Sequence, residues 1–265
     1  MGRLEGKVAI VTGAVGGTGT VLVRRFATEG ARVVGMDRRV VGEEQIPAGV
    51  GGSALFVEAD VTREEDWSRV VGIAEERFGG VDILVNNAAV LLLEAFDRTS
   101  RDDFLRVVEV NQLGPFLGMQ AVFESMKKRG EGSIINIAST DGIKGMNGVA
   151  AYASSKWGLR GLTKSTAMEL GRHRIRVNSI CPEAGNPNMS APFFPGNPDL
   201  SEVPHQMMQA ILAAPPHVEP SSRIEDIAHL AVYLASDESR SCTAADFIID
   251  AGLTAGHVQA GVPSA

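Results

Sequence analysis

Cysteine is scarce in this chain of 265 residues, and histidine never occurs in a metal-binding pattern. The two cysteines, Cys181 and Cys242, are too few for a disulfide framework and lack the spacing of zinc ligands. We expect both to be buried thiols. The five histidines do not pair at metal-site spacing either, so the sequence predicts no bound metal.

Long apolar runs and an excess of positive charge are also missing. No stretch approaches the roughly 20 apolar residues of a membrane span, and residues 1–7 carry charges where a secretory signal would be apolar. The formal net charge of −7 disfavours nucleic-acid and anionic-membrane binding, because both need a basic surface. We therefore expect a cytoplasmic protein that binds neither nucleic acid nor a membrane.

The chain does contain an alternation of strand-like and helix-like segments. Its composition, 44% hydrophobic and 22% charged, is that of a globular domain. Apolar runs predict strands at residues 7–12, 32–36, 54–58, 82–86, 133–137, 176–180 and 247–250. Helical spacing predicts helices at residues 17–29, 62–78, 100–129, 152–170 and 224–235. Thr62 and Glu65 form a predicted capping box, and Ser100 a predicted cap.

This alternation predicts an α/β protein in which one domain spans residues 1–265. Strands joined through helices form right-handed crossovers, so the sheet should be parallel and covered on both faces. We expect a doubly wound, Rossmann-type sheet of seven strands that carries both cofactor binding and catalysis.

The stretch 181–222 interrupts the alternation. It holds nine of the twelve prolines and neither Lys nor Arg. Because it is too apolar for a solvated linker, we predict an excursion at the carboxyl side of the sheet that forms the wall and lid of a substrate pocket. Met189, Met207 and Met208 would line this pocket, and the substrate would be neutral and apolar. The alternative is a rigid loop packed against another subunit.

A glycine-rich loop, TGAVGGTG, occupies residues 12–19 between the first strand and the first helix. Gly13, Gly17, Thr18 and Gly19 would let the backbone approach a pyrophosphate at the helix N-terminus. The Gly-x-x-x-Gly-x-Gly spacing differs from the commoner Gly-x-Gly-x-x-Gly, and a tight turn alone would also use glycines. Its place after the opening strand favours a dinucleotide site.

Asp37 ends the second strand, 18 residues beyond Gly19. A carboxylate there would accept hydrogen bonds from the adenosine ribose and repel a 2′-phosphate, which favours NAD over NADP. Arg38 and Arg39 follow and would attract such a phosphate, but we expect the repulsion by Asp37 to dominate. The alternative is a solvated acid at a strand end.

Tyr152 and Lys156 are spaced to share one face of a helix, and Ser139 ends the strand SIINIAS. An ammonium near the phenol would stabilise the phenolate and lower the pKa of Tyr152 from about 10, which makes it a usable general acid and base. Ser139 would donate to a substrate oxygen. A helix-surface pair and a strand-end cap are the corresponding structural alternatives.

In their order and spacing, these motifs resemble those of the short-chain dehydrogenase/reductases. The resemblance runs from about Leu4 to Gly256, and the stretch 152–182 is similar to bacterial hydroxysteroid dehydrogenases within that family. The motifs that carry it are the loop 12–19, Asn86-Asn87-Ala88, Asn111, Ser139 and Tyr152-x-x-x-Lys156.

The resemblance implies a role for each matching residue. Tyr152 would transfer the proton, Lys156 would lower its pKa and bind the nicotinamide ribose, and Ser139 would orient the substrate oxygen. Asn111 would hold a water in a proton relay. The cofactor would also contact Asp60 and Val61 beside the adenine, Asn87, and Pro182.

Three residues depart from the family pattern. Ala89 adds a methyl group where the family has glycine, and Glu183 replaces the glycine that usually follows Pro182. Pro187 stands near a position where a threonine normally helps hold the nicotinamide carboxamide, and proline has neither the hydroxyl nor the N–H. These departures bear on cofactor affinity more than on reaction type.

The leading hypothesis is an NAD-dependent alcohol dehydrogenase or ketone reductase. A catalytically silent NAD-binding sensor or assembly protein is the first alternative. A reductase of 3-oxoacyl thioesters is the second, although the stretch 181–222 offers an acidic carrier no Lys or Arg.

The helices 102–128 and 152–170 carry more apolar residues than one sheet face would cover, so we expect a homodimer or homotetramer. The alternative is a fully internal helix.

Overall fold

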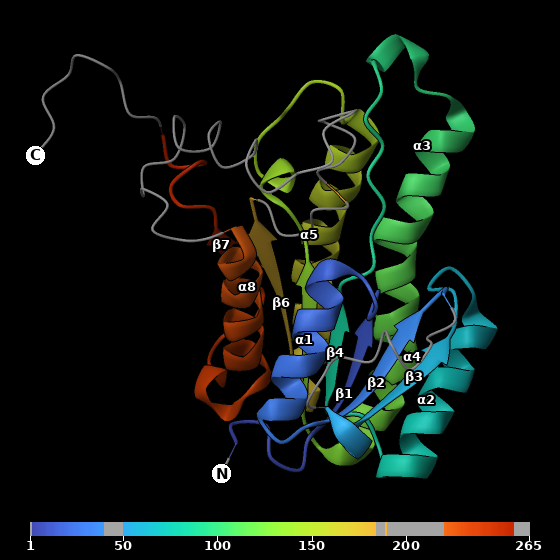
Figure 1. The fold of residues 1–265 in the computed structure, drawn as a ribbon, viewed down its shortest axis with the longest axis vertical. Helices are drawn as coiled ribbons and strands as arrows, with labels where there is room; N and C mark the ends of the chain where they lie inside the picture. The colour runs from blue at the N-terminus through green and yellow to red at the C-terminus, as the bar shows by residue number, and fades with distance from the viewer. Residues whose placement is uncertain (1, 40–49, 184–188, 190–219, 257–265) are drawn as a thin grey trace, which may run out of the picture.

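The computed structural model describes residues 2–39, 50–183, 189 and 220–256, and these contain one parallel sheet of seven strands (Figure 1). Its order is β3-β2-β1-β4-β5-β6-β7. The strands are β1 Val8–Thr12, β2 Arg32–Asp37, β3 Ala54–Glu58, β4 Ile83–Asn86, β5 Gly132–Ile137, β6 Ile175–Pro182 and β7 Asp246–Ile249. All seven predicted strands are confirmed, with ends that differ by at most two residues.

Helices cover both faces of this sheet, as predicted. In Figure 1, α1 and α8 lie side by side over one face, and α2, α4 and α5 pack on the other. Their bounds are α1 Gly17–Thr28, α2 Glu64–Phe78, α4 Gly114–Arg129, α5 Ala150–Leu170 and α8 Pro220–Ala235. The chain therefore has the doubly wound architecture that its alternation of elements predicts.

Strand β1 shows why the central strands are apolar throughout. Ala9 and Val11 belong to the hydrophobic core beneath α1 and α8, whereas Val8 and Ile10 belong to the core beneath α2 and α4. Successive side chains of a strand point to opposite faces, so a strand covered on both sides buries all of them. The period-2 pattern of a half-exposed strand is lost for this reason.

The helix predicted over residues 100–129 is interrupted. It forms α3, Arg101–Val108, and α4, joined by a π-helical turn at Glu109–Leu113. Ser100 caps α3 as predicted, with its Oγ accepting a hydrogen bond from the N–H of Asp103 at 3.1 Å. Single π turns within helices often occur at functional sites, and this one contains Asn111.

The predicted capping box of Thr62 and Glu65 is wrong. Helix α2 has Arg63 as its cap residue, and no side chain caps it. Oδ1 of Asp60 instead accepts both the N–H and the hydroxyl of Thr62, at 2.9 and 2.8 Å, and Glu65 pairs with Arg63. The carboxylate two residues earlier captures the Thr62 hydroxyl, so the hydroxyl is not directed to the helix.

Most of the stretch 181–222 lies outside the described residues, including Pro187, Met207 and Met208. Strand β6 runs to Pro182, and helix α8 begins at Pro220. The lid therefore stays a prediction. In the parts of the chain that are described, no helix is long and apolar enough to cross a membrane.

Candidate active site

The glycine loop turns between β1 and α1 at the carboxyl edge of the sheet. Gly13 has a φ of +64°, and a Cβ there would lie 2.9 Å from the Cα of Ala88. A Cβ on Gly19 would lie 1.9 Å from the carbonyl oxygen of Gly13. No side chain caps α1, so its first turn presents the N–H groups of Gly17, Thr18 and Gly19. The loop thus has the form that accepts a phosphate at a helix N-terminus.

Asn87 joins the glycine loop to the neighbouring strand end. Its Nδ2 donates to the carbonyl oxygens of Thr12 and Gly13, at 2.9 and 3.3 Å. The Thr12 hydroxyl accepts the N–H groups of Asn87 and Ala88, both at 3.0 Å. β1 and β4 are adjacent where the strand order reverses, so these bonds hold together the two strand ends at which doubly wound sheets generally bind ligands.

Asp37 lies at the end of β2, against the same loop. Its Oδ2 accepts the N–H of Val15 at 3.2 Å, and its Oδ1 accepts the N–H and Nε of Arg39 at 3.2 and 3.3 Å. The Asp37 side chain is 10% exposed, whereas that of Arg39 is 58% exposed. Asp37 is therefore a positioned acceptor, not the solvated strand-end acid of the alternative interpretation.

Asp60 and Val61 follow β3, one strand beyond Asp37. The carbonyl oxygen of Asp37 accepts the N–H of Ala59 at 2.8 Å, which brings these residues to the same edge. The carbonyl oxygen of Val61 accepts the indole N–H of Trp67 at 2.9 Å. The segment is held by α2 where the resemblance expects the adenine to be flanked.

Ser139, Tyr152 and Lys156 come together where β5 ends beside α5. All three are buried, with exposed fractions of 4%, 7% and 2%. The Oγ of Ser139 accepts the N–H of Asp141 at 3.1 Å, and Lys156 Nζ lies 5.7 Å from the centre of the Tyr152 ring. A Cβ on Gly142 would lie 3.1 Å from the backbone carbonyl of Lys156, so this glycine lets the turn after Ser139 approach the helix.

Burial is the largest cause of the pKa shifts of Tyr152 and Lys156. Loss of solvent raises the pKa of Tyr152 above its usual value, a hydrogen bond with Ser139 lowers it, and the nearby charge of Asp141 raises it. Burial lowers the pKa of Lys156 to about 8. The ammonium donates to the carbonyl oxygen of Ile137 at 2.7 Å. The predicted lowering of the Tyr152 pKa by Lys156 is not seen in this geometry, because the ammonium faces that carbonyl.

Asn111 is fully buried in the π turn. Its Oδ1 accepts the N–H of Val90 at 2.8 Å, and its Nδ2 donates to the Val90 carbonyl oxygen at 2.9 Å and to the Ser155 hydroxyl at 3.1 Å. Both amide hydrogens are used, so the side chain fastens the segment after β4 to α5. Its role in holding a water stays a prediction.

Two predicted residues lie near the end of β6 and Tyr152. Pro182 is the last residue of β6, and the N–H of Glu183 donates to the Ile249 carbonyl oxygen at 3.1 Å. Met189 packs against the apolar cluster that contains Val149 and Tyr152. One of the three methionines predicted to line the pocket is therefore adjacent to the candidate catalytic tyrosine.

The sequence analysis missed a polar layer behind Ser139. Asp141 is half-buried, and this burial raises its carboxyl pKa while Lys144 lowers it. Arg160 donates to the carbonyl oxygen of Gly142 and, at 2.8 Å, to the Asp246 carboxylate. The position of Asp141 two residues after Ser139 was the available signal, whereas the pairing of Arg160 with β7 has no local signature.

Metal-site geometry is missing from the described residues: no three His, Cys, Asp or Glu side chains are placed to hold an ion. Cys181 is buried, as predicted, and Cys242 is half-buried. Burial raises the pKa of the Cys181 thiol.

Comparison with known proteins identifies the family to which the chain belongs. A sequence profile of the short chain dehydrogenase family matches residues 7–197. The 3-alpha-(or 20-beta)-hydroxysteroid dehydrogenase of Mycobacterium tuberculosis is 40% identical over 257 residues, which cover 96% of this chain and 92% of that protein. The trans-4-hydroxycyclohexanecarboxylate dehydrogenase of Sinomonas cyclohexanicum is 39% identical over 264 residues, with 96% and 95% covered. A Burkholderia xenovorans crystal structure assigned to the short-chain dehydrogenase/reductases superposes with a TM-score of 0.86 at 32% identity, covering 97% of this chain and 99% of that one.

Proposed function

Because the chain belongs to the short-chain dehydrogenase/reductase family, we propose that this oxidoreductase transfers a hydride between NAD(H) and a neutral, hydrophobic secondary alcohol or ketone. The observation that carries the proposal is the convergence of Ser139, Tyr152 and Lys156 at the carboxyl end of β5. That edge is where parallel sheets bind their ligands.

Tyr152 is the proposed general acid and base. During oxidation of the alcohol, Tyr152 acts as the phenolate: its oxygen accepts the hydroxyl proton while the hydride leaves the carbon. In reduction the neutral phenol returns that proton. The nicotinamide ring, when bound, accepts that hydride or supplies it in reduction. Before substrate binds, the Ser139 hydroxyl hydrogen-bonds to Tyr152; when substrate is bound, this hydroxyl would turn to donate to the substrate oxygen and keep it within reach of the phenol.

The chain's own residues fit a dinucleotide cofactor. Glycines at 13 and 19 allow the tight turn of the loop, and the first turn of α1 offers uncapped N–H groups to a pyrophosphate. Asp37 is held beside this loop as an acceptor for a ribose hydroxyl. A 2′-phosphate would meet its negative charge, so we propose NAD rather than NADP.

The proposed substrate is a cyclic secondary alcohol. Two relatives are named for 3-alpha-(or 20-beta)-hydroxysteroids and for trans-4-hydroxycyclohexanecarboxylate, and both the 3-alpha hydroxyl of the steroid and the hydroxyl of the cyclohexane are secondary alcohols on a ring. The apolar cluster beside Tyr152 supports this choice, and the stretch 181–222 is the proposed lid. A substitution of Met189 with Ala should raise KM for bulky cyclic alcohols and leave NAD affinity unchanged.

The direct test measures NADH formation at neutral and alkaline pH with a panel of cyclic secondary alcohols, including hydroxysteroids. Reduction of 3-oxoacyl thioesters is measured in parallel. Turnover of ring alcohols above that of thioesters supports the proposal. Faster thioester reduction would instead indicate a 3-oxoacyl thioester reductase. NAD binding without turnover of either class would indicate a catalytically silent NAD-binding protein. The names of the two relatives favour neither alternative.

We also propose a homodimer or homotetramer. Phe104 on α3 and Phe116 on α4 are 38% and 39% exposed, and Trp157 and Met168 on α5 are 50% and 67% exposed. These apolar side chains contradict a fully internal position for the two helices and suit a subunit interface. Sedimentation at micromolar concentration should give a multiple of 28.0 kDa, and a monomer mass would refute the proposal.

A further inference from the structure

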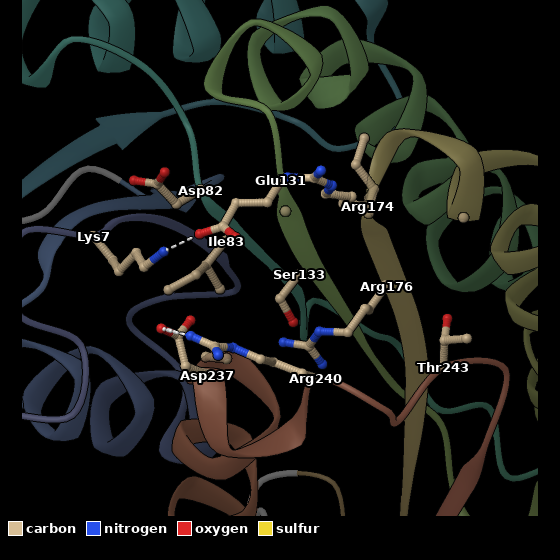
Figure 2. Close-up of a pocket in the computed structure, with 14 residues that line it drawn as sticks. Lys7, Asp82, Ile83, Glu131, Ser133, Arg174, Arg176, Asp237, Arg240 and Thr243 are labelled. Atoms are coloured by element: carbon tan, nitrogen blue, oxygen red, sulfur yellow. Dashed lines mark hydrogen bonds and ion pairs between the residues drawn. The ribbon is translucent and has the colours of Figure 1, made fainter.

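A cavity of about 520 Å³ opens at the amino-terminal edge of the sheet, at the opposite end of the strands from the candidate active site (Figure 2). Residues that begin or precede β1, β4, β5 and β6 line one side of it. The turn and loop that follow α8 line the other side, with Asp237, Arg240 and Thr243. Its size is that of a small-molecule site.

Each acidic side chain of this cavity already has a cationic partner. Figure 2 draws two of the ion pairs as dashed lines, and the third partner comes from the end of α4. The pairs are Lys7 with Glu131 at 2.6 Å, Arg240 with Asp237 at 2.8 Å, and Arg129 with Asp82 at 2.8 Å. Each of the three acids is therefore matched by one cation of its own.

Two arginines of β6 and the turn before it are not balanced. Among the described residues, Arg176 donates only to main-chain carbonyl oxygens, those of Leu234, Ser236 and Cys242, at 2.7 to 3.4 Å. Arg174 is exposed, and its side chain has no hydrogen-bond or ion-pair partner among the described residues. Within a chain of net charge −7, Arg174 and Arg176 add two positive charges to this cavity beyond its three ion pairs.

The half-buried Arg176 guanidinium would favour binding of an anion in this cavity. It is half-buried, and burial lowers its pKa, because the nearby charges of Asp237 and Glu131 compensate the lost solvent only in part. Arg176 is also the register partner of Ser133, so its position is set by the β5–β6 ladder. An anion that enters the cavity would meet a guanidinium already held in place by three main-chain carbonyls, whose Nε–H and remaining N–H can still donate.

We propose that this cavity binds a small molecule through a dianionic phosphate group, held by Arg174 and Arg176. Two negative charges balance the two unpaired arginines, and the planar fork of each guanidinium matches phosphate oxygens. The volume leaves room for an organic part beyond the phosphate. Inorganic phosphate and a small organic phosphate share this chemistry. The site does not depend on the proposed dehydrogenase function.

The test is thermal unfolding of the full chain with inorganic phosphate, against chloride at equal ionic strength. We expect a saturable rise in Tm of about 2–4 °C. Arg174→Asn should weaken phosphate binding about tenfold and remove most of the rise. Asparagine suits this position because Arg174 has a φ of +60°. Arg174→Gly is the second variant, and Arg172→Ala, an exposed arginine in the same turn, is the matched control.

The outcomes separate this cavity from the cofactor loop. Phosphate bound at the glycine loop would raise Tm equally in the wild type and in both Arg174 variants, and that result would overturn the proposal. An equal Tm in phosphate and chloride would also overturn it. Glycerol phosphate against glycerol then distinguishes the sources: a larger rise with glycerol phosphate than with inorganic phosphate assigns the site to an organic phosphate, and equal rises assign it to the free ion.

Discussion

The ammonium of Lys156 donates a hydrogen bond to the main-chain carbonyl oxygen of Ile137 at 2.7 Å, which ties α5 to the last residue of β5. Lys156 is 2% exposed, and burial lowers its pKa from the usual 10.5 to about 8. A buried ammonium without a carboxylate destabilises the folded chain. A buried Lys156 beside Ser139 and Tyr152 therefore indicates a functional role, because it lowers the free energy of unfolding.

Replacing Lys156 with Met should stabilise the protein and abolish turnover. At pH 7 we expect the free energy of unfolding to rise by about 1–3 kcal/mol, since a pKa lowered by some 2.5 units corresponds to about 3 kcal/mol and the lost hydrogen bond offsets part of it. Denaturant unfolding measures this change. A variant less stable than the wild type at pH 7 would contradict it.

The Lys156→Met variant also tests how the free energy of unfolding depends on pH. Between pH 8 and 10.5 the unfolded chain retains the Lys156 proton that the folded chain has lost, so wild-type stability from this group rises with pH across that window. The Met variant should lack this rise. Parallel stability curves for the two proteins from pH 7 to 10 would be incompatible with the lowered pKa.

Replacing Asp37 should weaken the preference for NAD. The wild type should favour NAD over NADP by roughly 100-fold in kcat/KM, because the carboxylate beside the loop would repel a 2′-phosphate. Asp37→Asn keeps an oxygen for the Val15 N–H and removes the charge, so the preference should fall to about tenfold or less. Arg39→Ala is the control and should strengthen the preference. Equal efficiency of the wild type with both cofactors would refute this assignment.

Replacing Asp141 with Asn should make Tyr152 easier to deprotonate. The Asp141 charge raises the pKa of the phenol, so its removal should move the rise of kcat/KM for alcohol oxidation to lower pH by roughly half a unit. The pKa of Asp141 is itself raised by burial, and stability from this carboxyl falls as pH increases through that raised value. The variant should therefore also be more stable at pH 7. An unchanged pH profile would show that Asp141 does not act on Tyr152.

The sheet could be predicted from the sequence because its signals are local. The run 7–12 is apolar at every position, and a strand buried on both faces requires this pattern. The break at Asn111 could not be predicted, since helical spacing continues through it and the amide bonds to Val90, 21 residues away. The capping box failed because Asp60, outside the four-residue pattern, competes for the Thr62 hydroxyl.

The candidate site likewise has features that local sequence predicts and features that depend on tertiary packing. Ser139, Tyr152 and Lys156 follow from a strand end and a helical spacing, and the structure brings them together as expected. The raised pKa of Tyr152 and the lowered pKa of Lys156 could not follow from spacing, because both result from how deeply the packed chain buries these groups. The contact of Arg160 with Asp246 spans 86 residues and depends on the packing of α5 beside β7.

The most direct test of the central claim compares Tyr152→Phe with the wild type on a cyclic alcohol that the wild type oxidises. The ring stays in the apolar cluster and only the phenolic oxygen is lost, so folding and NAD binding should be retained. We predict that kcat falls by about 10²–10⁴-fold, the usual contribution of a general acid or base. A Tyr152→Phe variant that binds NAD normally and keeps most of the wild-type kcat would contradict the account.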